Sequence, residues 1–288
     1  MTKWQDDSVE RYSPTARRRR LGLGLRSLRM SRGMNAEQAA KGLGISTSLL
    51  TKTETAERNV NRPALLGMLS FYKADDKETG ELLELHATSR ERGWFQEYGV
   101  QPGSFVDWES EASKVQGFED SFIPGLLQTE AYAEAVIAAT RPELPEAKRD
   151  AWAKARAERA ALLDETDGPE LHYIIHEHAL RLPVGGPEVM ADQLTRVVSL
   201  CQRMKNLTVQ VLPVSFGAHA GMEGAFTILT FAELPSLVAV EHVLSTAWYE
   251  KPTQINTFAT AFGRIATQAL PAPESLKLIR TVAKEWRT

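Results

Sequence analysis

The stretch NAEQAAKGLGISTSLLTKTE, residues 35–54, decides the fold of the N-terminal region. Asn35, with a glutamine three residues later, forms a capping-box pattern that predicts the start of a helix. Gly44 marks a turn, and Ser46 is the expected N-cap of a second short helix. The small side chain of Ala40, one helical turn before Gly44, lets the two helices approach closely. The sequence therefore predicts a tight helix-turn-helix.

Further helices are predicted on both sides of this stretch. Leucines recur at helical spacing in the preceding segment, where Gly33 ends the helix and Arg26 and Arg29 are expected on its other faces. Pro63 is expected to start a fourth helix, and Asp75 to cap a fifth. The predicted organisation is an arm of residues 1–14 followed by an all-α helix-turn-helix domain of residues 15–92.

Positive charge is concentrated in the same region. Residues 11–62 contain twelve Arg or Lys and three Glu, a net charge of +9, whereas the whole chain carries −3. A basic block on an otherwise acidic protein indicates a nucleic-acid partner. Binding to its phosphates should weaken steeply as salt rises. The alternative is a solvated basic N-terminus on an ordinary helical bundle, but here the charge coincides with helix-turn-helix spacing.

Residues 35–56 resemble the lambda-repressor-like, or xenobiotic-response-element type, helix-turn-helix. The resemblance implies that the helix from Ser46 to about Thr53 enters the major groove of double-stranded DNA. The family's base-reading positions are occupied here by Thr47, Ser48 and Lys52, and Thr51 is expected on the same face. Short hydroxyls can donate or accept toward several bases, so they predict no particular operator sequence.

Phosphate contacts are expected from the arginine cluster and from the segment after the recognition helix. The candidates are Arg17, Arg18, Arg19, Arg20, Thr55, Arg58 and Arg62. Glu54 matches the acidic residue that usually closes the family's motif. Two positions depart from the family pattern. Ala36 replaces a polar residue that contacts phosphate, and Ala56 replaces a glycine, so the backbone path after the recognition helix is not predicted.

The remaining sequence predicts a second domain, residues 93–288. A chain of 288 residues with 43% hydrophobic residues can bury more than one core. The expected strands are 171–175, 207–212, 225–231 and 237–243. The expected helices include 104–115, 145–163, 187–204, 252–268 and 273–286. Helices and strands interspersed in this way predict an α+β domain around a small sheet.

Four segments of this region carry a second resemblance. They are WESEAS (108–113), IPGLLQTEAYA (123–133), HEHALRLPVGG (176–186) and VQVLPVSFGAHAGMEGAF (209–226). In order and spacing they resemble the sensor half of a large family of actinobacterial regulators, WhiJ-like in type. The resemblance implies an antitoxin-like protein that pairs with a small partner protein encoded nearby. It implies no particular ligand.

Histidines suggest one further kind of site. His172, His176 and His178 would lie on one face of a strand that extended far enough. With His219 or Glu177 nearby they would offer ligands, chiefly imidazoles, to zinc. The alternative is that they are partly buried and form local hydrogen bonds. The chain has no HExxH motif and no cysteine pair, so we expect no metal.

Enzymatic signatures are missing from the sequence. No GxSxG nucleophile elbow and no phosphate-cradling glycine loop is present. Ser215, His219 and Glu223 recur four residues apart, but the intervening glycines indicate a loop, where that spacing fixes no common face. Cys201, the sole cysteine, excludes an internal disulfide and lies in a helical pattern that favours a buried thiol. We therefore expect neither an enzyme nor a cofactor.

The sequence predicts a sequence-specific, DNA-binding transcription regulator. It is expected to act as a homodimer on paired half-sites, with a C-terminal domain that binds a small partner protein or a small-molecule effector. The competing hypothesis is an antitoxin-like interaction module that sequesters its partner, with DNA binding secondary. No apolar run approaches ~20 residues, and no secretory signal is visible, so we expect a cytoplasmic protein without a membrane span, at the nucleoid when bound to DNA.

Overall fold

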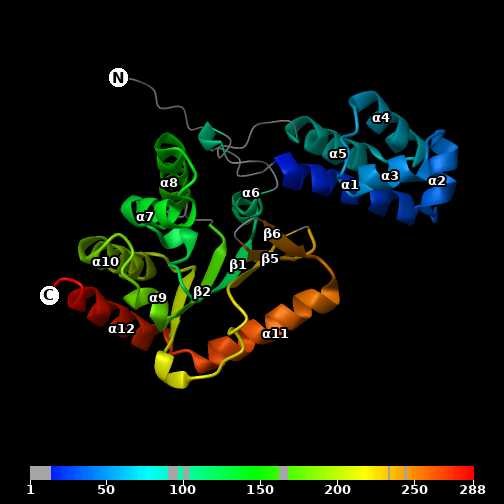
Figure 1. Ribbon diagram of the computed structural model, residues 1–288. Helices are drawn as coiled ribbons and strands as arrows, with labels where there is room; N and C mark the ends of the chain where they lie inside the picture. Colours follow the sequence, from blue (N-terminus) through cyan, green and yellow to red (C-terminus); the bar gives the residue numbers. More distant parts are fainter. Residues whose placement is uncertain (1–13, 90–96, 100–103, 162–167, 233, 243–244) are drawn as a thin grey trace, which may run out of the picture. The chain divides into compact units, whose positions relative to one another are not determined.

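The computed structural model divides the chain into two compact units. It describes residues 14–89, 97–99, 104–161, 168–232, 234–242 and 245–288. The first unit comprises residues 1–96 with 101–111, and the second comprises residues 97–100 with 112–288. Most elements of both are labelled in Figure 1. The predicted arm, residues 1–14, lies outside the described residues except for Pro14, where the first helix begins.

The predicted all-α N-terminal domain is confirmed. Its helices are α1 (Pro14–Ser31), α2 (Ala36–Leu43), α3 (Thr47–Glu54), α4 (Arg62–Phe71) and α5 (Asp76–Thr88), and the short α6 (Phe105–Ser110) belongs to the same unit. The helices enclose a core built mainly from leucines. The largest wholly buried side chains in it are Leu25, Leu50, Leu65 and Tyr72.

Side-chain caps define the helix ends. The Asn35 side chain accepts from the Gln38 backbone N–H at 2.8 Å, and the Gln38 side chain accepts from the Asn35 N–H at 2.9 Å, so the predicted capping box is confirmed. Ser46 caps α3 as predicted, accepting from Leu49 at 3.1 Å. The start of α4 differs from the prediction. Asn61 is its N-cap and Arg62 its first residue, so Pro63 is the second residue rather than the first.

The second unit is built on a six-stranded mixed sheet, which confirms the predicted α+β fold. Its strands are β1 (Lys114–Glu119), β2 (Glu170–His176), β3 (Leu207–Leu212), β4 (Phe226–Thr230), β5 (Leu237–Glu241) and β6 (Thr246–Tyr249). The spatial order is β3-β2-β1-β4-β5-β6. Strands β1 to β3 pair in parallel, and β4, β5 and β6 continue the sheet antiparallel.

Two strands were not predicted. The expected helix 104–115 is wrong, because α6 ends at Ser110 and β1 begins at Lys114. Trp108, Ala112 and Val115 do have helical spacing, but pairing of Val115 with both β2 and β4 overrides that local pattern. Strand β6 was missed because it is only four residues long, and because all four are half-buried, no alternation of buried and exposed positions marks it.

Helices cover both faces of this sheet (Figure 1). One face packs against α11 (Pro252–Gln268), through side chains such as Phe118, Ile174 and Phe262. The other helices are α7 (Glu130–Thr140), α8 (Glu146–Ala161), α9 (Glu177–Arg181), α10 (Pro187–Arg203) and α12 (Ala272–Glu285). Cys201 lies half-buried on α10, where burial raises the pKa of its thiol to about 12 and disfavours the reactive thiolate.

The helices that the structure describes include none with both the length and the apolar character that a bilayer-spanning segment needs.

Candidate nucleic-acid interface

The second helix of the helix-turn-helix, α3, has one buried and one exposed face. Leu50, Thr53 and Glu54 are buried against the rest of the unit. The four residues predicted to read bases all lie on the exposed side: Thr47, Ser48, Thr51 and Lys52. They form a continuous stripe because residues four apart lie on one helix face. The stripe has the size and chemistry to meet the edges of DNA bases.

The angle between α2 and α3 is set by a tight turn. Gly44 adopts φ +67°, a left-handed conformation that glycine takes without steric cost. Its backbone N–H donates to the carbonyls of Ala40 and Lys41, which ends α2. Ala40 is buried, as expected for a close approach of the two helices. The predicted helix-turn-helix geometry is thereby confirmed.

A buried ion pair joins α3 to α1. Arg29 Nε lies 2.7 Å from Glu54 Oε1, and Arg29 donates a second hydrogen bond to Glu54 Oε2 at 2.9 Å. A third Arg29 nitrogen donates to the Met34 carbonyl at 2.7 Å. The side chains of Arg29 and Glu54 are only 8% and 4% exposed. The expectation that Arg29 lies on a different face from the leucines is wrong, because Arg29 is buried and holds the end of α3.

Just after the end of α3, an alanine adopts the left-handed backbone conformation. Ala56 has φ +62° and occupies the position where the family usually has glycine. Its N–H donates to the Thr53 carbonyl at 3.2 Å, and the Arg58 N–H donates to the Lys52 carbonyl at 3.0 Å. These bonds cap the C-terminus of α3 and hold Ala56 in a conformation that costs a residue with a Cβ about 1–2 kcal/mol.

Replacing Ala56 with glycine is therefore expected to stabilise the N-terminal unit by about 1 kcal/mol. The left-handed backbone would lose its steric penalty, although the more flexible unfolded chain offsets part of the gain. Urea unfolding of the full chain with Ala56→Gly would measure the change. Gly33→Ala, at another left-handed position with φ +70°, should give the opposite sign. A glycine variant less stable than the wild type would contradict this account.

The arginine cluster lies on α1, and its members project in different directions because consecutive helical residues are about 100° apart. Arg18 donates to the Asn59 side chain at 3.0 Å. The Arg19 guanidinium carbon is 5.4 Å from the centroid of the Trp108 ring. Arg20 is half-buried and interacts within the chain. Arg17 is on α1, but its side chain is not among those described.

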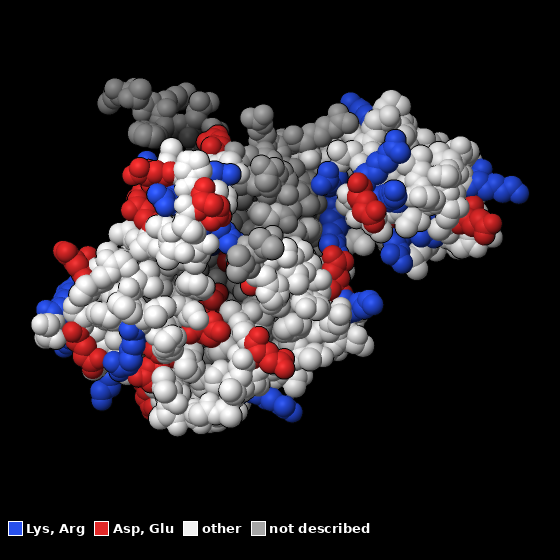
Figure 2. Space-filling model, viewed as in Figure 1, with Lys and Arg blue, Asp and Glu red and all other residues white. Residues whose placement is uncertain are grey.

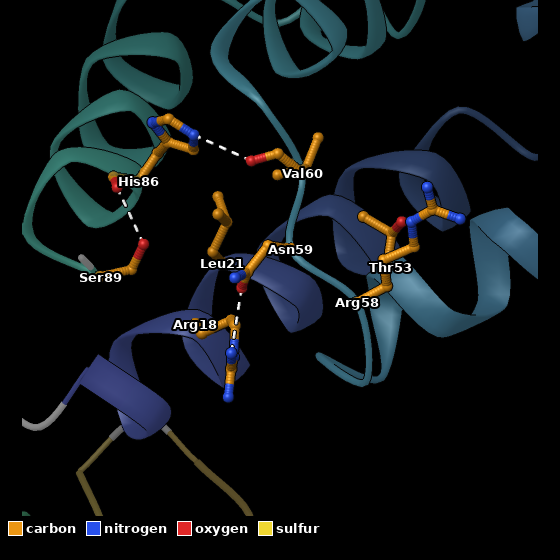
Figure 3. A pocket seen from close by; sticks show the side chains of 8 residues that line it. All are labelled: Arg18, Leu21, Thr53, Arg58, Asn59, Val60, His86 and Ser89. Carbon is orange, nitrogen blue, oxygen red and sulfur yellow. Dashed lines mark hydrogen bonds between the residues drawn. The ribbon is translucent and has the colours of Figure 1, made fainter. Parts of the chain in front are cut away.

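A small cavity beside the cluster brings several of the predicted residues together (Figure 3). Arg18, Arg58 and Asn59 line it, and its volume of about 10 Å³ suits a single water molecule. His86 also lines it, with Nε2 3.0 Å from the Val60 carbonyl oxygen. Because a carbonyl only accepts, that nitrogen carries the proton. Arg18 and His86 thus hold the segment that follows α3.

The remaining predicted phosphate contacts lie close to this segment. Arg58 and Arg62 are exposed, and Arg62 is the first residue of α4. The Thr55 hydroxyl donates to the Thr51 carbonyl at 3.0 Å and also lies 3.0 Å from the Glu57 carboxylate. Figure 2 shows Lys and Arg side chains over the unit formed by α1 to α5. Asn59, Asn61 and His86 also position this segment. They were not predicted, because no cluster of charge marks them in the sequence.

The histidines of the second unit do not form the arrangement considered from the sequence. Strand β2 ends at His176, so His178 falls in α9 instead of on the strand face. The His172 ring hydrogen-bonds to the Gln210 side chain at 2.8 Å. His176 stacks on His219 with ring centroids 5.3 Å apart. Burial, then the proximity of His219 and His178, lowers the pKa of His176 below its usual 6.5.

Comparison with known proteins gives two family matches, one in the N-terminal part of the chain and one in the remainder. A helix-turn-helix domain family matches residues 20–82, which contain the exposed stripe of α3 and the buried Arg29–Glu54 pair. A domain of unknown function, DUF5753, matches residues 102–281. No curated protein and no solved structure shows significant similarity to the chain. Because the second match spans more than half of its 288 residues, the chain belongs to the DUF5753 family and carries a helix-turn-helix domain at its N-terminus.

Proposed function

We propose that the protein is a sequence-specific transcription regulator that binds double-stranded DNA through α3. The observation that carries the proposal is the exposed stripe on α3, whose side chains can all donate hydrogen bonds to base edges. Its members are Thr47, Ser48, Thr51 and Lys52. Hydroxyl and ammonium groups suit the major groove, where each base pair presents a distinct pattern of donors and acceptors.

Phosphate contacts would come from the basic residues around this helix. Arg58 and Arg62 follow α3 and are exposed, so their side chains can reach a phosphate group. Arg18 lines the same small cavity as Arg58. Such contacts fix the register of a recognition helix on the duplex without reading its sequence. Arg17, Arg19, Arg20 and Thr55 complete the proposed set.

The second domain would control this binding. In the proposal it mediates homodimerisation and binds a small partner protein, encoded nearby, or a small-molecule effector; neither domain is catalytic. Pairing two recognition helices on half-sites about 34 Å apart raises specific affinity. A partner can regulate DNA binding only if it binds the two states unequally, and DNA must then change partner affinity by the same factor.

The test is binding of the purified full-length protein to DNA from upstream of its own gene, followed by fluorescence anisotropy across a salt series. A Thr47→Ala/Ser48→Ala/Lys52→Ala variant should bind this DNA tenfold to a hundredfold more weakly, at about 1 kcal/mol per lost hydrogen bond. Its binding to unrelated DNA should change far less. Wild-type affinity should fall steeply with salt, because neutralised phosphates release counterions.

The matched control is Lys77→Ala, which removes the same single charge from an exposed position on α5. It should leave cognate binding unchanged. Weak, equal binding of both DNAs by the wild type and the triple variant would mean that charge alone acts. That result would remove the base-reading role and favour the antitoxin-like module that sequesters its partner.

A further inference from the structure

A groove in the C-terminal unit is not used by the proposed DNA contacts. It runs between α11 and the loop from Pro213 to Ala225, which joins β3 to β4, and has a volume of about 710 Å³. Figure 1 shows this loop in yellow and α11 in orange. Ligand sites in proteins usually measure about 300–1,000 Å³. The groove is therefore large enough to bind a molecule rather than only solvent.

The α11 wall is a polar stripe on the exposed side of the helix. Its side chains are exposed, whereas Phe262 and Ile265 on the opposite side are buried in the core. The polar members of the wall are Thr253, Asn256, Thr257, Thr260 and Arg264. The Thr257 and Thr260 hydroxyls donate to carbonyls one turn earlier, at 3.0 Å and 2.8 Å. Their oxygen lone pairs remain available as acceptors.

The loop wall is held in place by side chains of the sheet. The His219 ring stacks on His176 and lies edge-on to Phe118, with ring centroids 5.7 Å apart in the second pair. His219 Nδ1 accepts from the Gly221 N–H at 3.1 Å. A Cβ at Gly221 would overlap the Phe118 ring, so the loop lies too close there for any larger residue. This wall is preformed, which lowers the entropy lost on binding.

Side chains on the front of this loop face outward. Met222 is 70% exposed, an unusual position for a large apolar side chain, and Glu223 is exposed beside it. In the part of the chain that the structure describes, neither Glu223 nor Arg264 forms an ion pair. The groove thus presents an exposed apolar side chain, an anion and a cation.

We propose that this groove binds an extended peptide segment of a partner protein. From Thr253 to Arg264 the stripe is about 16 Å long at 1.5 Å per residue, the length of about five residues of extended chain. The Asn256 amide offers one donor and one acceptor group, which match the C=O and N–H of a peptide bond. Arg264 and Glu223 would pair with an acidic and a basic side chain, and Met222 would contact an apolar one.

This inference extends the proposed function by placing the partner's binding site, but its test involves no DNA. Random linear peptides displayed on phage are selected against the immobilised full-length protein. Enriched peptides are then synthesised with an acetylated N-terminus and an amidated C-terminus, and their Kd is measured by fluorescence anisotropy. We expect Asn256→Ala/Arg264→Ala to weaken binding at least tenfold. Arg280→Ala, which removes an exposed arginine from α12, should leave the Kd unchanged.

Several results would overturn the proposal. Selection without enriched sequences, or equal binding of enriched peptides by the wild type and the double variant, would show that the groove binds no peptide. Binding of free dipeptides but not of the capped peptides would assign it to a small zwitterion instead. Because the substituted side chains are exposed, circular dichroism should show an unchanged fold. Loss of DNA binding with peptide binding retained would contradict only the regulator function.

Discussion

Replacing Glu54 with alanine is expected to destabilise the helix-turn-helix unit by about 3–5 kcal/mol, the usual effect of removing one partner from a buried ion pair. Stability is lost because the charge of Arg29 remains buried without its partner. Arg29 would keep its charge, because the hydrogen bonds and charge of Glu54 only raise a pKa that is already far above neutral. It would also keep its buried position, where one hydrogen bond to the Met34 carbonyl cannot compensate the lost carboxylate.

The net value of the ion pair is a separate quantity. Substituting both partners, as Arg29→Met/Glu54→Leu, replaces two buried charges with apolar side chains of similar length. Such exchanges are often neutral or stabilising, because the desolvation cost of the charges disappears. We therefore expect the double variant to regain most of the stability that Glu54→Ala loses. This recovery would show that the single variant fails through an unpaired charge and not through a cavity.

Urea unfolding of the full chain, followed by circular dichroism, measures both variants. Glu81→Ala is the control, because Glu81 pairs with Lys77 at 3.9 Å on the surface of the same unit, with side chains 64% and 85% exposed. Exposed pairs contribute about 0–1 kcal/mol. If Glu54→Ala and Glu81→Ala lost similar stability, Glu54 would not be the residue that holds α3 to α1.

The local features of the helix-turn-helix were predictable from the sequence because each depends on a few neighbouring residues. Capping by Asn35 and Ser46 follows from a side chain that bonds a backbone N–H three residues later. Pairing of Arg29 with Glu54 was not predicted, although they lie on the two helices the sequence identified. A signal exists in hindsight: Arg29 lies four residues after Leu25 on the buried stripe of α1, where a charge requires a partner.

The sheet shows where sequence patterns stop being sufficient. Strand β1 follows α6 without a recognisable turn, and its place between β2 and β4 depends on partners at residues 170–175 and 226–230. The groove beside α11 was equally hidden, because its walls come from segments about thirty residues apart in sequence. The glycines of this segment predicted only that it is a loop. The structure shows Gly221 packed tightly against Phe118.

The second large effect is expected at Gly22, where α1 crosses the end of α3. A Cβ at this position would lie 2.6 Å from the Glu54 carbonyl oxygen and 2.9 Å from that of Thr53. Both atoms belong to the backbone, so no side chain can rotate away to make room. Gly22→Val should therefore force α1 and α3 apart, and we expect it to destabilise the unit by about 3 kcal/mol, at the upper end of the usual cost of overpacking.

Helix propensity acts in the opposite direction but is too small to decide the outcome. Exchanging glycine for valine inside a helix gains only a few tenths of a kcal/mol. Gly80→Val isolates this contribution, because a Cβ on Gly80, which lies within α5, would meet no atom within 4 Å. It should change stability by less than about 0.5 kcal/mol.

The position of Gly22 also connects stability to DNA binding. The carbonyls that a new side chain would strike belong to the last turn of α3, which carries the exposed Lys52. Displacing that turn should weaken cognate DNA binding at temperatures where Gly22→Val is still folded, even though Gly22 is buried and touches no DNA in the proposal. Anisotropy with cognate DNA measures this effect. Unchanged affinity in a folded variant would mean that the recognition helix tolerates a shift, and that its exposed stripe does not read bases at fixed positions.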